Sequence, residues 1–314
     1  MSNTAFKSYD MVGVKEDVSD VISNISPTNT PFQTLVKTES IHNTLFQWQE
    51  DQLAMVGDNA AVEGADASDS VLNPTTMLSN YSQILTKTIR VSNTADKISA
   101  YGRAKETALH LSKKSAELKN ELEYALVGKA QDAAVGNETT ARKFGNVFGH
   151  GATGQALIDT GNVIDHTATP VALSENDILT ANQKLYEGGG EATILMIKPG
   201  DSLAVAGFTA AAGRTRMFDG SADKTIVNVV NLYVSPFGEQ KVVLNRFLKA
   251  DSALLFNPSY WKIAVLRPWT RIPLAVTGDA NRTQLIGEFS VKHLNRKASA
   301  AIRGLTGANV TIGQ

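Results

Sequence analysis

Residues 99–129 read SAYGRAKETALHLSKKSAELKNELEYALVGK, a stretch without proline in which apolar and small side chains recur every three or four positions. This spacing places one stripe of side chains on a single helix face, made up of Tyr101, Ala104, Ala108, Leu111, Ser115, Leu118, Leu122 and Ala125. At about 1.5 Å per residue, about 28 residues form a rod of roughly 40 Å. The rival interpretation is a coiled coil, but alanine and serine within the stripe favour a long helix laid against a sheet.

Two β-strand patterns precede this helix. Residues 45–49 and 82–91 alternate apolar and polar side chains and are rich in β-favouring residues. Residues 57–73 between them are mostly Ala, Asp, Ser and Gly, with little that could pack into a core. The sequence therefore predicts a long, protruding two-stranded loop, and a loop of this length in a compact domain usually has a function of its own.

The N-terminal region is predicted to be an arm. Residues 15–25 have a short helical pattern, and the segment Ser26-Pro27-Thr28-Asn29-Thr30-Pro31 follows it. Two prolines four positions apart prevent a helix there and keep the chain extended.

The region after the long helix mixes helices and strands. Residues 130–171 are dense in Gly, Thr and Ala and are predicted to form a loop-rich connection. A helix is predicted to begin at Ser174, with Asp177 three positions on as its capping partner, and to end at the three glycines of 188–190. A turn at 198–200 leads to a helix at 201–206. Strands are predicted at 192–197, 225–234, 240–244, 253–256, 261–266 and 284–294, so the fold class is α+β.

Composition excludes several function classes. The chain of 314 residues has 30 Lys and Arg against 31 Asp and Glu, which argues against a protein devoted to gripping DNA. It has no cysteine, so disulfides, thiolate metal sites and cysteine nucleophiles are absent. No apolar run approaches the roughly 20 residues that span a bilayer, and the first residues lack the apolar core of a signal peptide. We expect a soluble protein made in the cytoplasm.

Charge is distributed unevenly along this nearly neutral chain. Residues 1–73 contain eleven acids and three bases, a net charge of −8, whereas residues 262–303 contain eight bases and two acids, a net charge of +6. An acidic head and a basic tail suggest that copies of the chain attract one another. The alternative is two solvated faces without a partner.

Two short motifs suggest catalysis, and neither has the context that catalysis needs. Residues 149–154 match GxGxxG, but they lie inside the irregular connection and not between a strand and a helix. Gly200-Asp201-Ser202-Leu203 spells the signature of the GDSL esterases. Members of that family have an Asp-x-x-His motif near the C-terminus. In this chain His293 is the only histidine after Ser202, and Ser290 stands where the aspartate of that motif would be. Because neither motif has its catalytic context, we expect no enzyme activity and no cofactor. We also expect no metal site, because the five histidines lack metal-ligand spacing.

The segment 15–32, KEDVSDVISNISPTNTPF, resembles the opening of a subfamily of tailed-bacteriophage major capsid proteins, in which an ISPxxTPF stretch follows a short helix. The order of arm, extended loop, long helix and α+β region is similar to the Hong Kong 97 capsid fold. The resemblance implies an N-terminal arm at 1–43, an extended loop at 44–92 and an axial domain with its connection at 136–269. It also implies a peripheral domain at 93–135 and 270–314, with the long helix as its spine.

The resemblance further implies a structural protein of the virion, assembled in the host cytoplasm through hexamers and pentamers into an icosahedral head around double-stranded DNA. Because the arm is shorter than the scaffolding segment of some relatives, it implies a separate scaffold protein, and a portal is the other expected partner. The alternatives are a nanocompartment shell of the same fold and, remotely, a GDSL-type serine esterase.

The charge pattern predicts which residues meet between subunits. A protruding loop cannot bury itself on its own chain, so a contact with the next copy explains its length. We expect the acids of the loop tip, Asp58, Glu63, Asp66 and Asp69, to meet bases near the C-terminus, Lys292, Arg296 and Lys297. The alternative is that these acids only keep the loop soluble.

Overall fold

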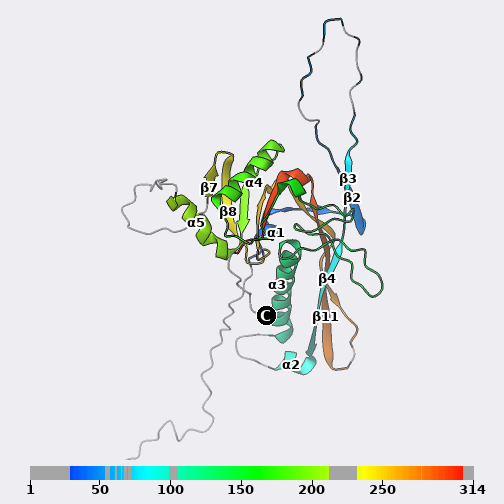
Figure 1. Ribbon diagram of the computed structural model, residues 1–314. Coiled ribbons are helices and arrows are strands. Elements are labelled where there is room, and N and C mark those ends of the chain that lie inside the picture. Colours follow the sequence, from blue (N-terminus) through cyan, green and yellow to red (C-terminus); the bar gives the residue numbers. More distant parts are fainter. Residues whose placement is uncertain are drawn as a thin grey trace, which may run out of the picture.

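The computed structural model describes residues 29–53, 57–60, 62–64, 66, 69, 72–98, 105–211, 232–276 and 278–306. It is an elongated molecule with a narrow two-stranded loop at one end and a long sheet with a parallel helix at the other (Figure 1). The helix predicted at 15–25 and most of the predicted arm lie outside the described residues.

A four-stranded sheet forms the elongated end of the molecule. Its strand order is β1-β10-β11-β4, and strand β1 runs parallel to β10 whereas the other pairs are antiparallel. The strands are β1 (Lys37–Ser40), β4 (Gln83–Ser92), β10 (Trp261–Pro273) and β11 (Ala280–His293). The strands predicted at 82–91, 261–266 and 284–294 are therefore confirmed, and the last two extend further than the alternation indicated.

A six-stranded sheet forms the centre of the other lobe, in the order β5-β12-β9-β6-β8-β7. The strands are β5 (Val163–Asp165), β6 (Ile194–Ile197), β7 (Leu232–Ser235), β8 (Gly238–Leu244), β9 (Ser252–Phe256) and β12 (Ser299–Arg303). Every residue of β6 and β9 is buried, because these two strands lie in the middle with packed side chains on both faces. Most of the strand predicted at 225–234 lies outside the described residues.

The described helices are α1 (Pro31–Leu35), α2 (Asn93–Lys97), α3 (Glu106–Val127), α4 (Glu175–Glu187) and α5 (Ser202–Ala211), with short 3-10 turns at Thr160–Asn162, Pro199–Asp201, Pro258–Tyr260 and Arg296–Ala298. Three of these helices, α3, α4 and α5, confirm helices predicted from the sequence, whereas α1 and α2 were not predicted. The side chains of Ser174 and Asp177 form the predicted reciprocal capping box at the start of α4. Gly189, just past the end of α4, has a φ of 77°, which suits glycine best.

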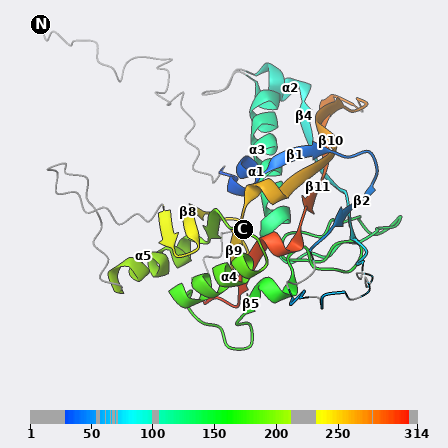
Figure 2. The same ribbon diagram turned by 90° about the horizontal axis from the view of Figure 1, so that it is seen from above.

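The long helix α3 lies beside the four-stranded sheet, as predicted (Figures 1 and 2). It is described from Glu106 onward, so the first residues of the predicted stripe fall outside the described part. Leu118, Leu122 and Ala125 of the stripe are buried, together with Leu126. The C-terminal half of α3 is thus the part that packs into the core, where Phe32 contacts the rings of Phe256 and Trp261 and joins the two sheets.

A buried carboxylate attaches the root of the N-terminal segment to α3. Glu123 accepts hydrogen bonds from the backbone N–H groups of Phe32 and Gln33, at 2.8 and 3.1 Å, and from the Asn245 side chain at 2.8 Å. Burial raises the pKa of Glu123 above its ordinary value, and these hydrogen bonds counteract that shift. Glu123 therefore takes the place of a cap for the short helix α1, whose own N-cap side chain makes no hydrogen bond.

The predicted loop exists, but its strand pairing is different from the expected one. Strand β2 (Leu45–Glu50) pairs with β3 (Thr76–Tyr81) and not with residues 82–91. Those residues form β4, which pairs over ten positions with β11, about two hundred residues away in the sequence. The prediction was wrong because alternation identifies a strand without identifying its partner. The loop therefore leaves the sheet at Ser82, between β3 and β4.

The segments expected for the domains are divided between the two sheets. Strand β4, within the segment 44–92, belongs to the four-stranded sheet. Strand β12, within the segment 270–314, pairs with β9 and β5 in the six-stranded sheet. The chain thus crosses from one sheet to the other immediately after β11.

Candidate functional site

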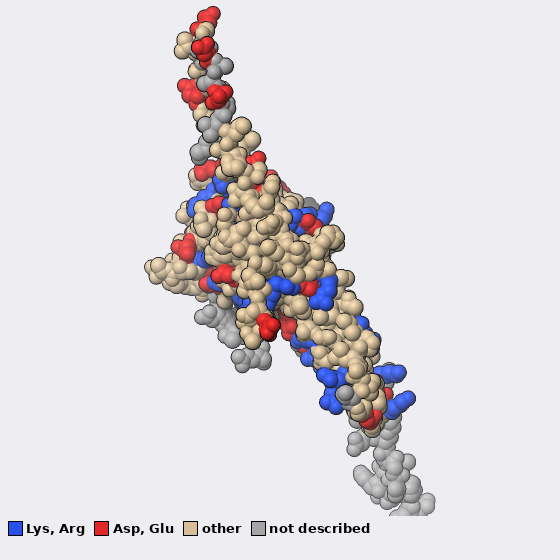
Figure 3. Space-filling model, turned by 90° about the vertical axis from the view of Figure 1, so that its right-hand side faces the viewer, with Lys and Arg blue, Asp and Glu red and all other residues tan. Residues whose placement is uncertain are grey.

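The extended loop projects from the molecule beyond β2 and β3 (Figure 1). All four acids predicted for its tip, Asp58, Glu63, Asp66 and Asp69, are described and exposed. In the space-filling view the loop shows acidic side chains and no basic ones near its end (Figure 3). None of these four carboxylates forms an ion pair with another described residue.

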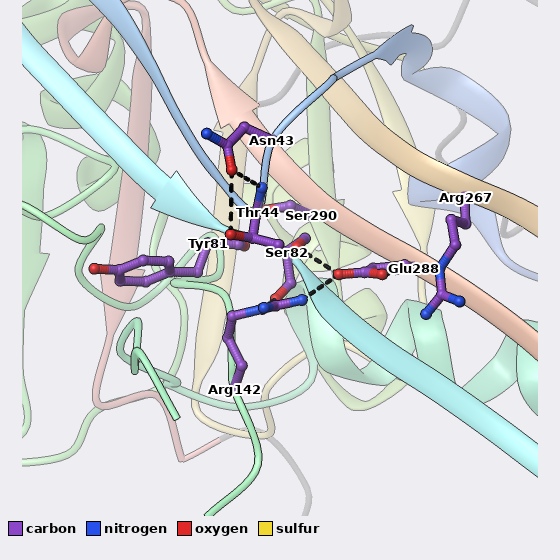
Figure 4. Close-up of polar contacts among 8 residues, drawn as sticks. All are labelled: Asn43, Thr44, Tyr81, Ser82, Arg142, Arg267, Glu288 and Ser290. Atoms are coloured by element: carbon purple, nitrogen blue, oxygen red, sulfur yellow. Dashed lines mark hydrogen bonds and ion pairs between the residues drawn. The ribbon is translucent and has the colours of Figure 1, made fainter. Parts of the chain in front are cut away.

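An ionic cluster around a buried carboxylate lies at the base of the loop, where β3 passes into β4 (Figure 4). Glu288 of β11 is 3% exposed and forms ion pairs with Arg142 and with Arg267, the latter at 3.0 Å. Its Oε1 also accepts a hydrogen bond from the Ser82 hydroxyl at 2.7 Å. Two cations and a hydroxyl thus compensate a carboxylate that burial alone would destabilise.

Backbone contacts extend this cluster to the first residues of the loop. Arg142 Nε donates to the carbonyl oxygen of Ser82 at 2.7 Å, and the Ser290 hydroxyl donates to the carbonyl oxygen of Tyr81 at 2.7 Å. The Ser82 N–H donates to the carbonyl oxygen of Thr44 at 2.9 Å. Arg142, Ser290 and Thr44 therefore all bind the backbone at the point where the loop leaves the sheet.

Asn80 of β3 is fully buried and satisfies backbone groups of three separate segments. Its Nδ2 donates to the carbonyl oxygens of Gly145 and Val291, both at 2.8 Å. Its Oδ1 accepts from the Gly145 N–H at 2.8 Å and from the Tyr81 N–H at 2.9 Å. One side chain therefore joins the loop, the irregular connection and β11.

The other strand of the loop is attached to the end of β11. Trp48 Nε1 donates to the carbonyl oxygen of His293 at 2.7 Å, and Arg296 Nε donates to Glu50 Oε1 at 2.7 Å. The Arg296–Glu50 pair is mostly buried, with side-chain exposures of 20% and 13%. Both strands of the hairpin thus have fixed positions at their base.

His293 is completely buried and neutral. Its ring stacks on Trp261 at 3.9 Å between centroids, its Nδ1 lies 2.5 Å from the carbonyl oxygen of Leu157, and its Nε2 lies 3.0 Å from the Ser299 hydroxyl. Burial lowers the pKa of His293 to about 3. Because Nδ1 faces a carbonyl oxygen, that nitrogen carries the proton.

These contacts do not pair Ser202, the serine of the GDSL tetrapeptide, with His293. The Ser202 hydroxyl donates to the carbonyl oxygen of Pro199 at 2.7 Å, as a local contact at the start of α5. Both ring nitrogens of His293 are engaged by Leu157 and Ser299. A nucleophilic serine requires a base within hydrogen-bond reach, and the described contacts give Ser202 none.

The three bases expected to meet the loop tip have different surroundings. Lys292 pairs with Glu39 at 2.9 Å and Arg296 pairs with Glu50, so both are engaged within their own chain. Lys297 is exposed and, among the described residues, forms no ion pair.

Sequence reasoning missed Glu288, Arg142 and Asn80. The available signal was a single carboxylate, between Gly287 and Phe289, in a strand that has no other acidic residue. Its partners Arg142 and Ser82 stand 146 and 206 positions away, so the sequence could not identify them.

Within the described part of the chain, no group of three or more His, Asp or Glu side chains is arranged to hold a metal ion. None of the described helices is long and apolar enough to cross a membrane.

The sequence is similar to known shell proteins. A model of the SU10 major capsid protein family matches residues 1–306. A protein described as the major capsid protein of Escherichia phage Phieco32 is 34% identical, and the match covers 95% of this chain and 96% of that protein.

Solved structures share the fold at much lower identity. The capsid asymmetric unit of cyanophage A-1(L) superposes with a TM-score of 0.65 at 12% identity, over 96% of this chain and 98% of that chain. The encapsulin complex of Synechococcus elongatus superposes with a TM-score of 0.56 at 8% identity, over 93% and 96% of the two chains. Phage capsids and an encapsulin therefore share this architecture.

Proposed function

The chain belongs to the SU10 major capsid protein family, and on that premise we propose that its extended loop contacts a neighbouring copy in the shell of a phage head. Its function is structural: it is a phage major capsid protein with the Hong Kong 97-like fold, and its place is the virion. As a major capsid protein it assembles with copies of itself.

The observation that supports this role for the loop is the contrast between its base and its tip. The base is held by Asn80, Trp48 and the Glu288 cluster, whereas the described residues between β2 and β3 expose acids and apolar side chains. Leu53 and Leu72 are 97% and 90% exposed. An acidic and apolar tip on a fixed base is suited to a heterologous contact, in which one copy covers a different surface of the next.

We assign the parts of the chain by analogy with the family. Residues 1–43 are the arm and 44–92 the extended loop. Residues 93–135 and 270–314 supply the peripheral domain with α3 as its spine, and 136–269 supply the connection and the axial domain. The position of β12 in the six-stranded sheet supports placing residues 299–303 with the axial domain instead.

For the interface itself, the proposed acids are Asp58, Glu63, Asp66 and Asp69. Of the proposed bases Lys292, Arg296 and Lys297, only Lys297 is exposed and without an ion pair to a described residue, so it is the one of the three that is free to meet a second copy. Exposed charges of this kind tune the assembly rate and the register more than the affinity, and salt weakens them.

The finer features of assembly are also part of the proposal. We expect hexamers and pentamers that close into an icosahedral head, with a scaffold protein and a portal as further partners. Packaged double-stranded DNA would be held without sequence-specific contacts, because the near-neutral chain provides no strong attraction to phosphates.

Electron microscopy with light-scattering mass tests the function directly. The chain would be produced alone and together with the neighbouring genes. We expect uniform shells or five- and six-membered rings; a monomer or small dimer under every condition would contradict the proposal. A nanocompartment would give shells filled with protein cargo, whereas a phage head would give shells that take up DNA when the packaging proteins are present.

The absence of enzyme activity is likewise proposed from the family. Hydrolysis of a chromogenic ester by the chain and by Ser202→Ala is the matched assay. We expect equal background rates, and activity that disappears in Ser202→Ala would contradict us.

A further inference from the structure

One face of the four-stranded sheet is open. Along β4, residues 85, 87, 89 and 91 face α3, where Lys87 forms ion pairs with Glu117 and Glu121 at 2.7 and 2.6 Å. Residues 84, 86, 88 and 90 point the other way and are exposed. Among the described residues, no helix covers this second face, which looks toward the viewer in Figure 3.

Two arginines lie side by side on the open face. Arg90 of β4 is directly opposite Arg282 of β11 in the antiparallel register, so their side chains project from the same face. Like charges in directly opposite positions repel each other and destabilise the pair of strands. The repulsion between the two arginines is offset if an anion lies beside them, either within the chain or on a partner molecule.

The described residues of the chain do not supply this anion. No described carboxylate forms an ion pair with either arginine, and Arg282 Nε is buried without a hydrogen-bond partner. Asp279, the acid nearest to Arg282 in the sequence, accepts hydrogen bonds from Asn93 and Thr94 instead. The arginine pair is therefore an unneutralised positive site.

Exposed apolar side chains lie on the same face of the sheet as the arginine pair. Ile84 of β4 and Ile272 of β10 are 46% and 39% exposed. The register places Ile272 opposite Gln284, and Gln284 opposite Thr88, two positions from Arg90. The open face thus combines two cations with exposed isoleucines and a ladder of uncharged polar residues.

The loop has the complementary chemistry. Residues 51–75 contain five carboxylates and no lysine or arginine, together with the exposed apolar residues Leu53, Val62 and Leu72. The loop and the free end of the four-stranded sheet point away from each other at opposite ends of the molecule (Figures 1 and 3). The loop therefore cannot reach this face of its own chain, and the matching surface belongs to another copy.

We propose that the open face around Arg90 and Arg282 is the surface on which a second copy seats its acidic loop. This inference rests on the proposed function, and it replaces Lys292 and Arg296 by two bases that form no ion pair with the described part of their own chain. The contact is head to tail: each copy offers its loop to one neighbour and its arginine face to another.

Charge reversal tests the pairing. Arg90→Glu with Arg282→Glu puts carboxylates opposite the loop acids, and we expect the shell yield to fall about tenfold or more at low salt. Lys241→Glu with Arg246→Glu, at two exposed bases on and after β8, makes the same change in charge and should leave assembly intact. Lys297→Glu separates the two candidate surfaces. Loss of shells in Lys297→Glu but not in the arginine variant would overturn the inference.

Restoring complementarity is the stricter test. Adding Asp66→Lys and Asp69→Lys to the reversed-arginine chain makes both surfaces opposite to their original sign, and shells should return. Circular dichroism and the thermal midpoint of unassembled subunits check that each variant folds. A folded chain with reversed arginines that assembles like the original, with the same salt dependence, would refute the proposal.

A covalent trap works even if the charge variants fail to fold. The chain has no cysteine, so Asp66→Cys with Thr88→Cys introduces the only two thiols. Mild oxidation should link copies into ladders on a non-reducing gel, whereas Asp66→Cys with Gln183→Cys on α4 should not. If the unaltered chain forms no shells, the proposed function fails; if it forms shells and the 66–88 pair does not link, only this inference fails.

Discussion

The base and the tip of the extended loop belong to one hairpin but have opposite physical character. At the base, Asn80 is fully buried and Glu288 nearly so, and their polar atoms are satisfied within the chain. At the tip, Asp66 and Asp69 are exposed and form no ion pair with a described residue. The difference is consistent with our proposal that folding fixes the direction of the loop, whereas assembly supplies the contacts of its tip.

Such a division has a thermodynamic advantage. A loop whose base is already ordered loses less conformational entropy on docking than a loop that is free along its whole length. Interactions at the base should therefore appear in the stability of the isolated subunit, and interactions at the tip should appear only in assembly. The following substitutions test this separation.

Removal of the buried carboxylate should have the largest effect. Glu288→Ala leaves Arg142 and Arg267 without their counter-charge and Ser82 without its acceptor. We expect the free energy of unfolding to fall by about 3 kcal/mol. This value is at the low end of the range for broken buried ion pairs, because both arginines are partly exposed. Urea unfolding of unassembled subunits measures it. Arg267→Ala, at the more exposed partner, should cost much less, and equal losses would contradict this assignment.

Asn80→Ala should come next. The substitution leaves the N–H of Gly145 and two carbonyl oxygens without partners in a buried environment. We expect a loss of about 2 kcal/mol and faster proteolysis within the loop. Asn80→Asp keeps the acceptor oxygen and loses the two donated bonds, so it separates the contributions. Unchanged proteolysis in Asn80→Ala would show that this side chain does not fix the loop.

Lowering the pH should reduce the free energy of unfolding of the subunit, because His293 is buried beside the base of the loop. The pKa of His293 is about 3 in the folded chain, against an ordinary value of 6.5. Between these values the unfolded chain binds a proton that the folded chain does not, so stability is full above pH 6.5 and falls as the pH decreases. The slope is about 1.4 kcal/mol per pH unit.

Urea unfolding of subunits from pH 7 to pH 4 measures this dependence, with His293→Gln as the control. The difference between the two chains removes the contribution of Glu123, whose raised pKa acts in the opposite direction. Parallel pH profiles would refute the assignment to His293.

Substitutions at the tip should have the smallest effect on the subunit. Asp66→Lys with Asp69→Lys should change the free energy of unfolding by no more than about 0.5 kcal/mol, because both side chains are exposed. The same pair should slow assembly and alter its salt dependence, followed by light scattering between low and high salt. A large loss of subunit stability would show that the tip has contacts within its own chain.

The sequence predicted those parts of the fold that local patterns control. The capping box of Ser174 and Asp177 was correct because both partners lie within one helical turn. The strand at 82–91 was correct as a strand and wrong as the partner of 45–49, since alternation carries no information about which strand lies beside it. The exposed acids of the loop were visible as a run without bases, and exposure at a loop tip needs no partner within the chain.

The sequence by itself thus determined the α+β class, the long helix, the protruding acidic loop and the family resemblance, all of which depend on neighbours a few positions apart. Only the tertiary structure decided that Glu288 meets Arg142, that Lys292 and Arg296 are neutralised within the chain, and that Arg90 and Arg282 form no ion pair with a described residue. Ion pairing could not be predicted from the sequence because the interaction of two charges depends on their distance in space and on burial. The folded chain brings together residues that stand up to about two hundred and fifty positions apart.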